Sequence, residues 1–318
     1  MIARPQITSS FRSAFASAST VVGGKIYDEQ NVPSLSDASP SQFSATLHLI
    51  GQEPINLNFV DGEVIDYCNV NGDVQEMPKF LSQSCMKPLV YAMGLTKGLD
   101  VHSKIGTTGD IGYADHNLDP NGRALNPVIN TGSLTLLEEL GRTLTKEEIG
   151  SWCQRLGGGD GESPFCVAGY EATKKDSLRN RYIATYLACN AVLPKTEDAI
   201  ERAVDNYAAM DCLLMTTSIL AAIGMNLSNR GGEIVSPETS RSVVSMMLHC
   251  GMYESSGEWA RTVGIAAKSG VSGCIFAAMP GVGGVAVHSP LIDNVGNSVR
   301  GMKFLEMFLA DHPEVKLF

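Results

Sequence analysis

Gln83-Ser84-Cys85-Met86-Lys87-Pro88 marks the start of a helix. Proline has no backbone N–H, and only the first helical turn leaves N–H groups unpartnered, so Pro88 predicts a helix that begins near Ser84. Residues three apart on a helix share a face, which brings the Lys87 amine within reach of the Ser84 hydroxyl. This S-x-x-K spacing predicts a serine nucleophile with a lysine base, at the positive end of the helix dipole where an oxyanion is stabilised.

A lysine is a useful base near neutral pH only if its pKa falls by about three units from its ordinary value of about 10.4. Burial lowers the pKa of a lysine, and so does a second cation close by. The sequence offers such a cation in Lys268-Ser269-Gly270, a K-[ST]-G motif on a predicted strand near the C-terminus. Either motif alone occurs by chance in many proteins, but their combination in this order indicates a serine hydrolase.

Strand patterns occur at both ends of the chain. Residues 44–50 and 55–59 alternate apolar and polar side chains with a period of two, and the turn 51–54 between them predicts a hairpin. Three further strands are expected at Val263–Val271, Cys274–Met279 and Val285–Ser289. Val299, Met302, Leu305, Phe308 and Leu309 follow at the spacing of an amphipathic helix. In the N-terminal segment, Phe11, Phe15 and the surrounding Ala and Ser residues fit a short surface helix.

The middle of the chain has helical spacing instead. Its apolar residues predict helices within 134–156, 176–193, 195–222 and 236–250, with breaks at 157–159 and 231–232. We therefore expect an α/β (α+β) fold: one antiparallel sheet built from both chain ends and flanked by helices, with an all-helical insertion. The sheet subdomain covers about 1–88 and 250–318, and the helical subdomain about 89–249, within a single unit of 1–318.

The glycine clusters do not indicate a nucleotide site. Gly157–Gly161 lacks the G-K-[ST] ending of a phosphate loop, and Gly281–Gly284 lies between two predicted strands, where a hairpin turn explains it. The eight cysteines and six histidines form no metal-binding spacing. We therefore expect no cofactor and no metal.

Composition restricts the possible binding partners and the expected cellular compartment. The net charge is −10 without a basic run, which argues against nucleic acid or an anionic membrane as partner. No apolar stretch reaches the roughly 18 residues of a membrane span. Single, unpaired cysteines are typical of a reduced, cytoplasmic protein. The first 27 residues, with three basic residues and no acid before Asp28, leave mitochondrial import open as the alternative.

The two motifs and the expected architecture resemble the penicillin-recognising serine hydrolases, which implies a β-lactamase-like fold. Further stretches resemble the serine-dependent glutaminases. They are residues 83–88, 126–130 (NPVIN), 179–184 (RNRYIA), 250–253 (CGMY) with 256–257 (SG), 267–273 (AKSGVSG), and 290–293 with 296–301 (GNSVRG). The resemblance covers about residues 80–310 and implies hydrolysis of L-glutamine to L-glutamate and ammonia.

The resemblance also implies a role for each matching residue. Ser84 would attack the side-chain amide, Lys87 would accept its proton, and Tyr253 would relay a proton to the leaving ammonia. Lys268 is the second cation, and the backbone N–H groups of Ser84 and Val271 would form the oxyanion hole. The residues implied to bind the amino and carboxylate groups of the substrate are Asn130, Glu171, Asn180 and Tyr207.

The sequence departs from the family pattern in three places. The interval from Glu171 to Asn180 is two residues longer than usual, so Thr173 stands at the ungapped position, and the interval from Tyr207 to Cys212 is one residue longer. Tyr27 is out of register with the tyrosine that commonly follows G-G-K, and we leave it outside the site. Asn130 and Asn180 also have structural explanations, in a loop turn and on an exposed helix face.

Two alternatives stay open: another amide, ester or β-lactam hydrolase on the same fold, and a catalytically silent scaffold protein. The family often forms oligomers, so we expect a homodimer or homotetramer.

Overall fold

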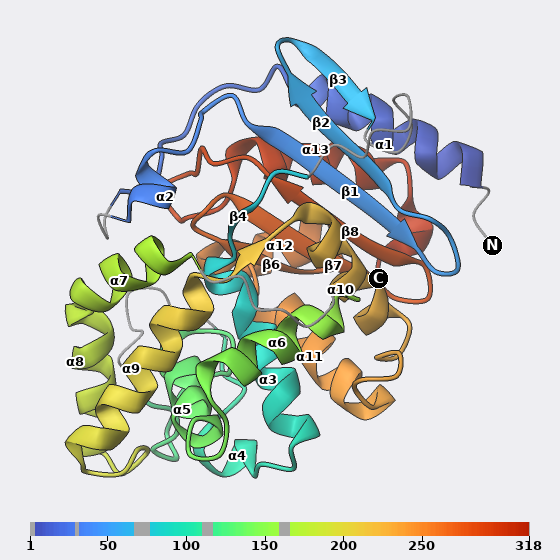
Figure 1. Ribbon diagram of the computed structural model, residues 1–318. Helices are drawn as coiled ribbons and strands as arrows, with labels where there is room; N and C mark the ends of the chain where they lie inside the picture. The colour runs from blue at the N-terminus through green and yellow to red at the C-terminus, as the bar shows by residue number, and fades with distance from the viewer. Residues whose placement is uncertain (1–3, 29–31, 67–76, 110–116, 159–165, 318) are drawn as a thin grey trace.

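The computed structural model describes residues 4–28, 32–66, 77–109, 117–158 and 166–317. Its centre is a six-stranded sheet in the order β3-β2-β1-β8-β7-β6, with every neighbouring pair antiparallel. The strands are β1 (Phe43–Leu49), β2 (Ile55–Val60), β3 (Glu63–Asp66), β6 (Ala266–Gly270), β7 (Cys274–Met279) and β8 (Gly283–His288). The two ends of the chain meet where β1 pairs with β8, with Ser44 opposite His288. The expected sheet built from both chain ends is thus confirmed (Figure 1).

Within the six-stranded sheet, the predicted strands agree closely with the observed ones, with one omission. The hairpin turn expected at 281–284 joins β7 to β8. Strand β3 was not predicted, because its four residues carry charged side chains at both ends and form the exposed edge of the sheet. The glycine cluster that begins at Gly157 extends into residues 159–165, which lie outside the described residues. Cys68 also lies outside the described residues.

One face of the sheet is covered by α1 (Arg4–Ala18) and α13 (Val299–Ala310). Phe11 and Phe15 are fully buried in this layer, where Phe11 meets the Phe304 ring edge-on at 5.4 Å and Phe15 stacks on Phe43 at 4.1 Å. The expected N-terminal helix is therefore present, with one face exposed at the surface and the other buried in this layer. The two phenylalanines are one turn apart, so they form an apolar face that the sheet covers.

Helix α10 (Thr217–Ser228) covers the other face of the sheet and contacts β8, β7 and β1. Glycines permit this close approach, because a Cβ on Gly284 would lie 2.1 Å from the Ala221 carbonyl oxygen and one on Gly224 would lie 2.4 Å from the Ala277 carbonyl oxygen. Helix α10 falls within the range 89–249 expected to be the helical subdomain, yet its main contacts are with the sheet.

The helical half holds the remaining long helices. They are α3 (Lys87–Thr96), α5 (Asn130–Leu140), α6 (Lys146–Leu156), α7 (Val167–Lys175), α8 (Leu178–Cys189), α9 (Glu197–Asp211) and α11 (Pro237–Cys250), with the short α4 (Val101–Lys104). The predicted segment 134–156 divides between α5 and α6, because Thr145 and Glu148 form a capping box that starts a new helix. The segment 195–222 divides between α9 and α10, with β5 (Leu214–Met215) between them.

Short elements connect the two halves. Strand β4 (Phe80–Leu81) pairs with β5, and the 3₁₀ turns η1 (Gln83–Met86), η2 (Tyr253–Ser255) and η3 (Pro313–Val315) and the helices α2 (Pro33–Ser36) and α12 (Ser256–Thr262) complete the description. In Figure 1 the blue and red strands of the sheet lie above the green and yellow helices.

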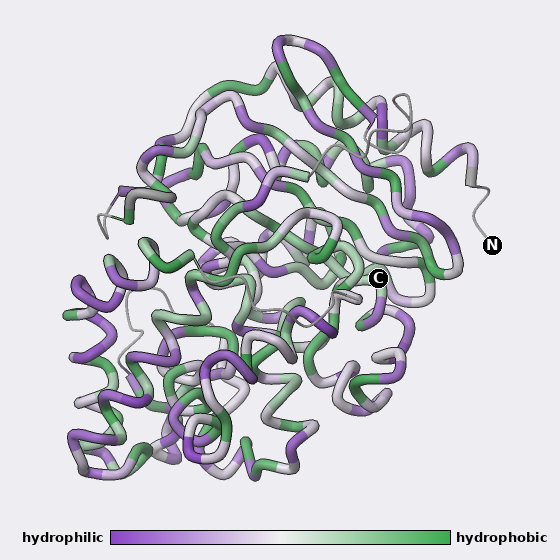
Figure 2. Tube along the Cα trace, in the orientation of Figure 1, coloured by the Kyte–Doolittle hydropathy of each residue, from purple (hydrophilic) through white to green (hydrophobic). Residues whose placement is uncertain are grey.

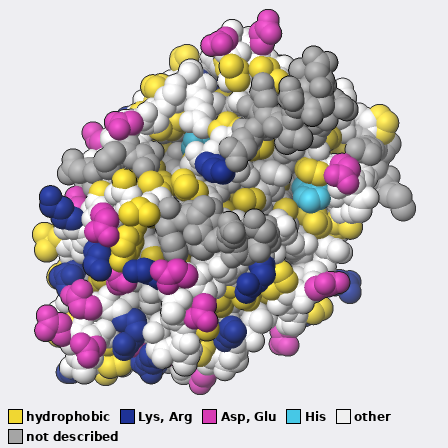
Figure 3. Space-filling view, viewed as in Figure 1, with side chains coloured by type: hydrophobic (Ala, Val, Ile, Leu, Met, Phe, Trp, Pro, Cys, Tyr) yellow, Lys and Arg dark blue, Asp and Glu magenta, His cyan; other side chains and the backbone are white. Residues whose placement is uncertain are grey.

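Polar character concentrates on the outer helices. Hydrophilic residues colour much of α7, α8 and α9 in Figure 2, and Figure 3 shows acidic and basic side chains interspersed over the same half of the molecule. Within the described residues, no helix combines the length and the hydropathy needed to cross a bilayer.

Candidate active site

Ser84 and Lys87 lie where the sheet half meets the helical half. The helical turn begins at Gln83 as η1 and continues into α3, which has Pro88 in its first turn, in agreement with the prediction of a helix start near Ser84. Lys87 Nζ is hydrogen-bonded to Ser84 Oγ. The Lys87 side chain is buried and Ser84 is half-buried, so a substrate can still reach the hydroxyl.

Two residues beside Ser84 have left-handed backbone conformations. Gln83 has φ 46° and Tyr253 has φ 52°, a region that costs a non-glycine residue about 1–2 kcal/mol. Gln83 is held in place by its side chain, whose Nε2 donates to the Asp211 carbonyl oxygen at 3.1 Å. Strain of this kind persists where the surrounding structure fixes a functional geometry.

Tyr253 on η2 lies beside Ser84, and Lys268 on β6 lies against the Tyr253 ring. Lys268 is 1% exposed, donates to the Ser269 carbonyl oxygen at 2.7 Å, and lies 4.5 Å from the centroid of the Tyr253 ring. The Tyr253 hydroxyl is buried without a hydrogen bond of standard geometry, although Ser84 is close enough to interact with it. Burial raises the pKa of Tyr253 well above its ordinary value, and the interaction with Ser84 opposes this effect. The phenol therefore stays protonated near neutral pH.

The end of β6 lies against the backbone that carries Ser84. A Cβ on Gly270 would lie 3.0 Å from the Ser82 carbonyl oxygen and 3.4 Å from the Cys85 backbone nitrogen. Val271 follows directly, and a Cβ on Gly296 would touch both the Val271 side chain, at 3.4 Å, and the Tyr253 ring, at 3.3 Å. The end of β6 therefore lies against the segment 82–85 that carries Ser84, and Val271 follows it directly.

Three helices contribute polar side chains that are hydrogen-bonded in series. The Tyr207 hydroxyl on α9 donates to Asn130 Oδ1 at the start of α5 at 3.1 Å, and Asn130 Nδ2 donates to Asn180 Oδ1 on α8 at 3.1 Å. Lys87 Nζ lies 5.2 Å from the centroid of the Tyr207 ring. The structure thus brings Asn130, Asn180 and Tyr207 together, with Tyr207 next to Lys87.

Glu171 does not join this group. It is exposed on α7, and its described contacts do not connect it with Asn130, Asn180 or Tyr207. Thr173, the residue at the ungapped position, is 1% exposed and contacts Cys212 Sγ at 3.4 Å. Residues two apart on a helix point in nearly opposite directions, so the residue facing inward here is Thr173.

Asp211, the last residue of α9, was not identified from the sequence. It is 5% exposed, burial raises its pKa to about 6, and Lys87 and Lys268 act in the opposite direction. Its position four residues after Tyr207, on the same helix face, is the sequence feature that could have identified it. Among the described residues, no group of three or more His, Cys, Asp and Glu side chains could hold a metal ion.

Comparisons with known proteins agree with this geometry. A family model described as Glutaminase matches residues 29–318. The chain is similar to a glutaminase of Microcystis aeruginosa, with 33% identity over 304 residues that cover 91% of this chain and 82% of the relative. It is also similar to a glutaminase of Clavibacter michiganensis subsp. michiganensis, with 36% identity over 309 residues, 93% of this chain and 87% of the relative.

A solved structure supports the same assignment. The structure of Mglu in its tris and glutamate form has a TM-score of 0.81 at 26% sequence identity, over 100% of this chain and 68% of that chain. The expected β-lactamase-like fold is confirmed by this likeness together with the antiparallel sheet and its helices. The chain is an enzyme that belongs to the glutaminase family, whose members hydrolyse glutamine to glutamate.

Proposed function

We propose that this protein hydrolyses L-glutamine through an acyl-enzyme on Ser84, with Lys87 as general base. The observation that carries the proposal is the hydrogen bond between Lys87 Nζ and Ser84 Oγ at the start of α3. A neutral lysine amine in this position can accept the hydroxyl proton as Oγ attacks the carbonyl carbon of the side-chain amide.

The first half of the reaction ends with ammonia and an ester. The tetrahedral oxyanion is stabilised by the backbone N–H groups of Ser84 and Val271. The C–N bond then breaks, the Tyr253 hydroxyl donates a proton to the departing nitrogen, and the Lys87 ammonium passes the proton taken from Ser84 to the Tyr253 oxygen, so that both groups return to their starting forms. The raised pKa of Tyr253, caused by burial, keeps this proton available.

The second half repeats the chemistry with water. Lys87 accepts a proton from the attacking water, the ester bond to Ser84 Oγ breaks, and glutamate leaves while the serine hydroxyl is restored. Asn130, Asn180 and Tyr207 hold the polar groups at the far end of the substrate, because their amide and phenol groups are suitable partners for a carboxylate and an ammonium group.

Ammonia release from L-glutamine, without added metal or nucleotide, tests the activity, with L-asparagine and a chromogenic β-lactam as comparison substrates. Ser84→Ala should reduce kcat by a factor on the order of 10⁶, as in other serine hydrolases. Ser103→Ala, an exposed serine bonded only to the Asp100 carbonyl oxygen among the described residues, is the matched control and should keep full activity.

Acid quenching during turnover, followed by peptide mass spectrometry, should find a γ-glutamyl group on the peptide that contains Ser84. Lys87→Arg, which cannot deprotonate, should be inactive although it keeps the positive charge. Normal turnover by either Ser84→Ala or Lys87→Arg would refute the assigned roles.

A further inference from the structure

Asp211 has a buried carboxyl side chain, and the backbone at and around it is hydrogen-bonded to the segment that carries Ser84. Its carbonyl oxygen accepts from Gln83 Nε2 at 3.1 Å, and the Met210 carbonyl oxygen accepts from Ser82 Oγ at 3.0 Å. On the other side, the Ser82 backbone N–H donates to the Leu213 carbonyl oxygen at 2.9 Å, continuing the β4–β5 pairing. These bonds fix the end of α9 against residues 82–84.

The side chain of Asp211 is buried at the end of α9. Tyr207, one turn earlier on the same face of α9, contacts Lys87 with its ring, so the helix directs Asp211 toward the same amine. Lys87 and Lys268 are the charges that act on the carboxylate. The other titratable groups around this cluster are Tyr253 on η2, Cys85 on η1, Cys274 on β7, and Cys212, which follows Asp211.

The two buried lysines therefore share one buried anion within the described part of the chain. An anion favours the charged form of a nearby lysine, while a second cation favours the neutral form. Lys87 changes between these forms in each turnover, because it is neutral before it accepts the Ser84 proton and positive afterwards. Lys268 favours the state before the transfer, and Asp211 favours the state after it.

We propose that Asp211 is a positioning residue for Lys87, whose carboxylate stabilises the ammonium formed when Lys87 accepts the proton of Ser84. This inference rests on the proposed function of Ser84 and Lys87. It concerns a single proton, which moves from Ser84 Oγ to Lys87 Nζ as the bond from Oγ to the substrate carbon forms.

The test compares Asp211→Asn with wild type in the pH dependence of kcat and KM for L-glutamine. Without the carboxylate, the ammonium form of Lys87 is less stable, so the acidic limb of kcat should move to lower pH by about one unit. The plateau of kcat should fall by a factor of about ten, because the amine is a weaker base and its protonated form loses a partner. KM should stay within about twofold of wild type, since the proposed role of Asp211 acts through Lys87 and not through binding of the substrate.

Two further variants complete the experiment. Asp211→Glu keeps the charge and should recover most of the wild-type profile, while Glu147→Gln removes an exposed acid in the first turn of α6 and should change nothing. Asp211→Asn should fold, because it replaces a carboxylate whose ionised form burial disfavours. If it does not fold, Asp211→Ser allows the same measurement in a smaller side chain.

Either of two results would overturn the inference. One is an unchanged kcat profile in a folded Asp211→Asn protein, and the other is a raised KM at constant kcat, which would make Asp211 a partner of the substrate ammonium group. Wild-type activity and the loss of activity in Ser84→Ala are measured in the same series. A failure of the proposed function would therefore appear as an inactive wild type or an active Ser84→Ala, independently of the result at position 211.

Discussion

At the scale of single residues, the proposed reacting groups and the proposed substrate-holding groups depend differently on sequence spacing. Ser84 and Lys87 are three residues apart on one turn, so local geometry alone joins them. Asn130, Asn180 and Tyr207 come from three different helices and meet only through tertiary packing. A change in the second group should therefore alter substrate affinity more than the chemical step.

Asn180→Ala removes the acceptor of the Asn130 amide and an amide that can bind the substrate. A hydrogen bond to a charged group is worth about 1.5–3 kcal/mol, so KM for L-glutamine should rise roughly ten- to a hundredfold, with kcat within a few-fold of wild type. Steady-state kinetics of ammonia release measures both constants. An equal loss in kcat with KM unchanged would show that Asn180 acts only in the transition state.

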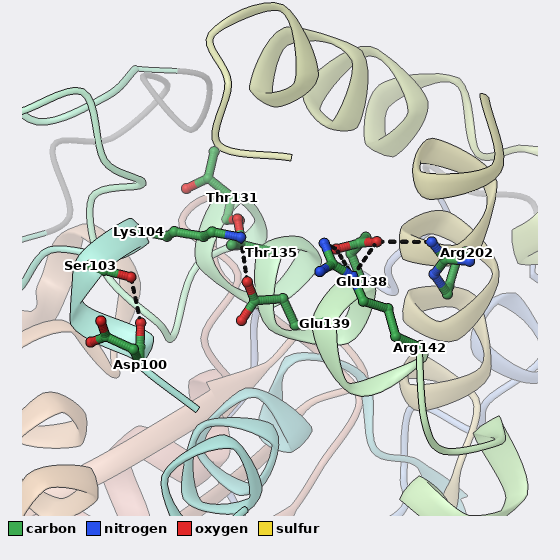
Figure 4. Close-up of polar contacts among 9 residues, drawn as sticks. All are labelled: Asp100, Ser103, Lys104, Thr131, Thr135, Glu138, Glu139, Arg142 and Arg202. Atoms are coloured by element: carbon green, nitrogen blue, oxygen red, sulfur yellow. Dashed lines mark hydrogen bonds and ion pairs between the residues drawn. The ribbon is translucent and has the colours of Figure 1, made fainter. Parts of the chain in front are cut away.

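At the scale of elements, the substrate-holding group depends on how α5 packs against α9. Glu138 on α5 is completely buried and accepts from Arg142 Nη2 at 2.6 Å and from Arg202 Nη2 on α9 at 3.0 Å (Figure 4). Asn206 on α9 adds a bond from Nδ2 to the Leu137 carbonyl oxygen at 3.1 Å. This contact lies two turns from Asn130 along α5, and it fixes the pair of helices that presents Asn130 to Tyr207.

Glu138→Gln should destabilise the fold by roughly 2 kcal/mol, less than the 3–5 kcal/mol of a fully buried pair because both arginines keep access to water. It should also raise KM, because the spacing of Asn130 and Tyr207 becomes less well defined. The matched control is Glu139→Gln, which removes a partly exposed pair with Lys104, also drawn in Figure 4, and should cost less than about 1 kcal/mol. Equal melting temperatures of the two variants would contradict this role for Glu138.

The difference between local spacing and tertiary packing also explains which parts of the fold were predictable. Strand β7 was predicted exactly, because both of its faces are apolar and Gly273 and Pro280 bound it. Helix α10 has an apolar pattern like that of its neighbours, and only the close approach at Gly224 and Gly284 shows that it packs on the sheet. The choice between Glu171 and Thr173 could not be made from the sequence, because the altered spacing leaves open which residue of α7 turns inward, and Asp211 was not identified.

At the scale of the whole molecule, two buried titratable groups make stability depend on pH in opposite directions. His288 on β8 is 2% exposed, stacks on Phe80 at 4.0 Å, and has Nε2 3.0 Å from the Ser272 carbonyl oxygen. Burial lowers its pKa from 6.5 to about 4, so its contribution is complete above pH 6.5 and is lost as the pH falls toward 4. Burial raises the pKa of Asp211 from 3.8 to about 6, so the fold gains stability from Asp211 as the pH falls from about 6 to 3.8.

Each shift corresponds to roughly 3 kcal/mol, and the two windows overlap between about pH 4 and 6, so the contributions largely cancel in the wild type. Asp211→Asn removes the contribution that stabilises the fold as the pH falls. It should be more stable than wild type at pH 7 by up to about 3 kcal/mol, and this advantage should disappear near pH 4. His288→Asn should show the opposite trend: its loss of unfolding free energy relative to wild type should be largest at pH 7 and smaller at pH 4, because wild type itself loses the contribution of the neutral ring.

Urea unfolding of the three proteins at several values between pH 4 and 7 measures these differences. The contributions of the other acidic groups are the same in all three proteins and cancel in the comparison. Parallel stability curves for all three proteins would mean that neither group has a shifted pKa in the fold.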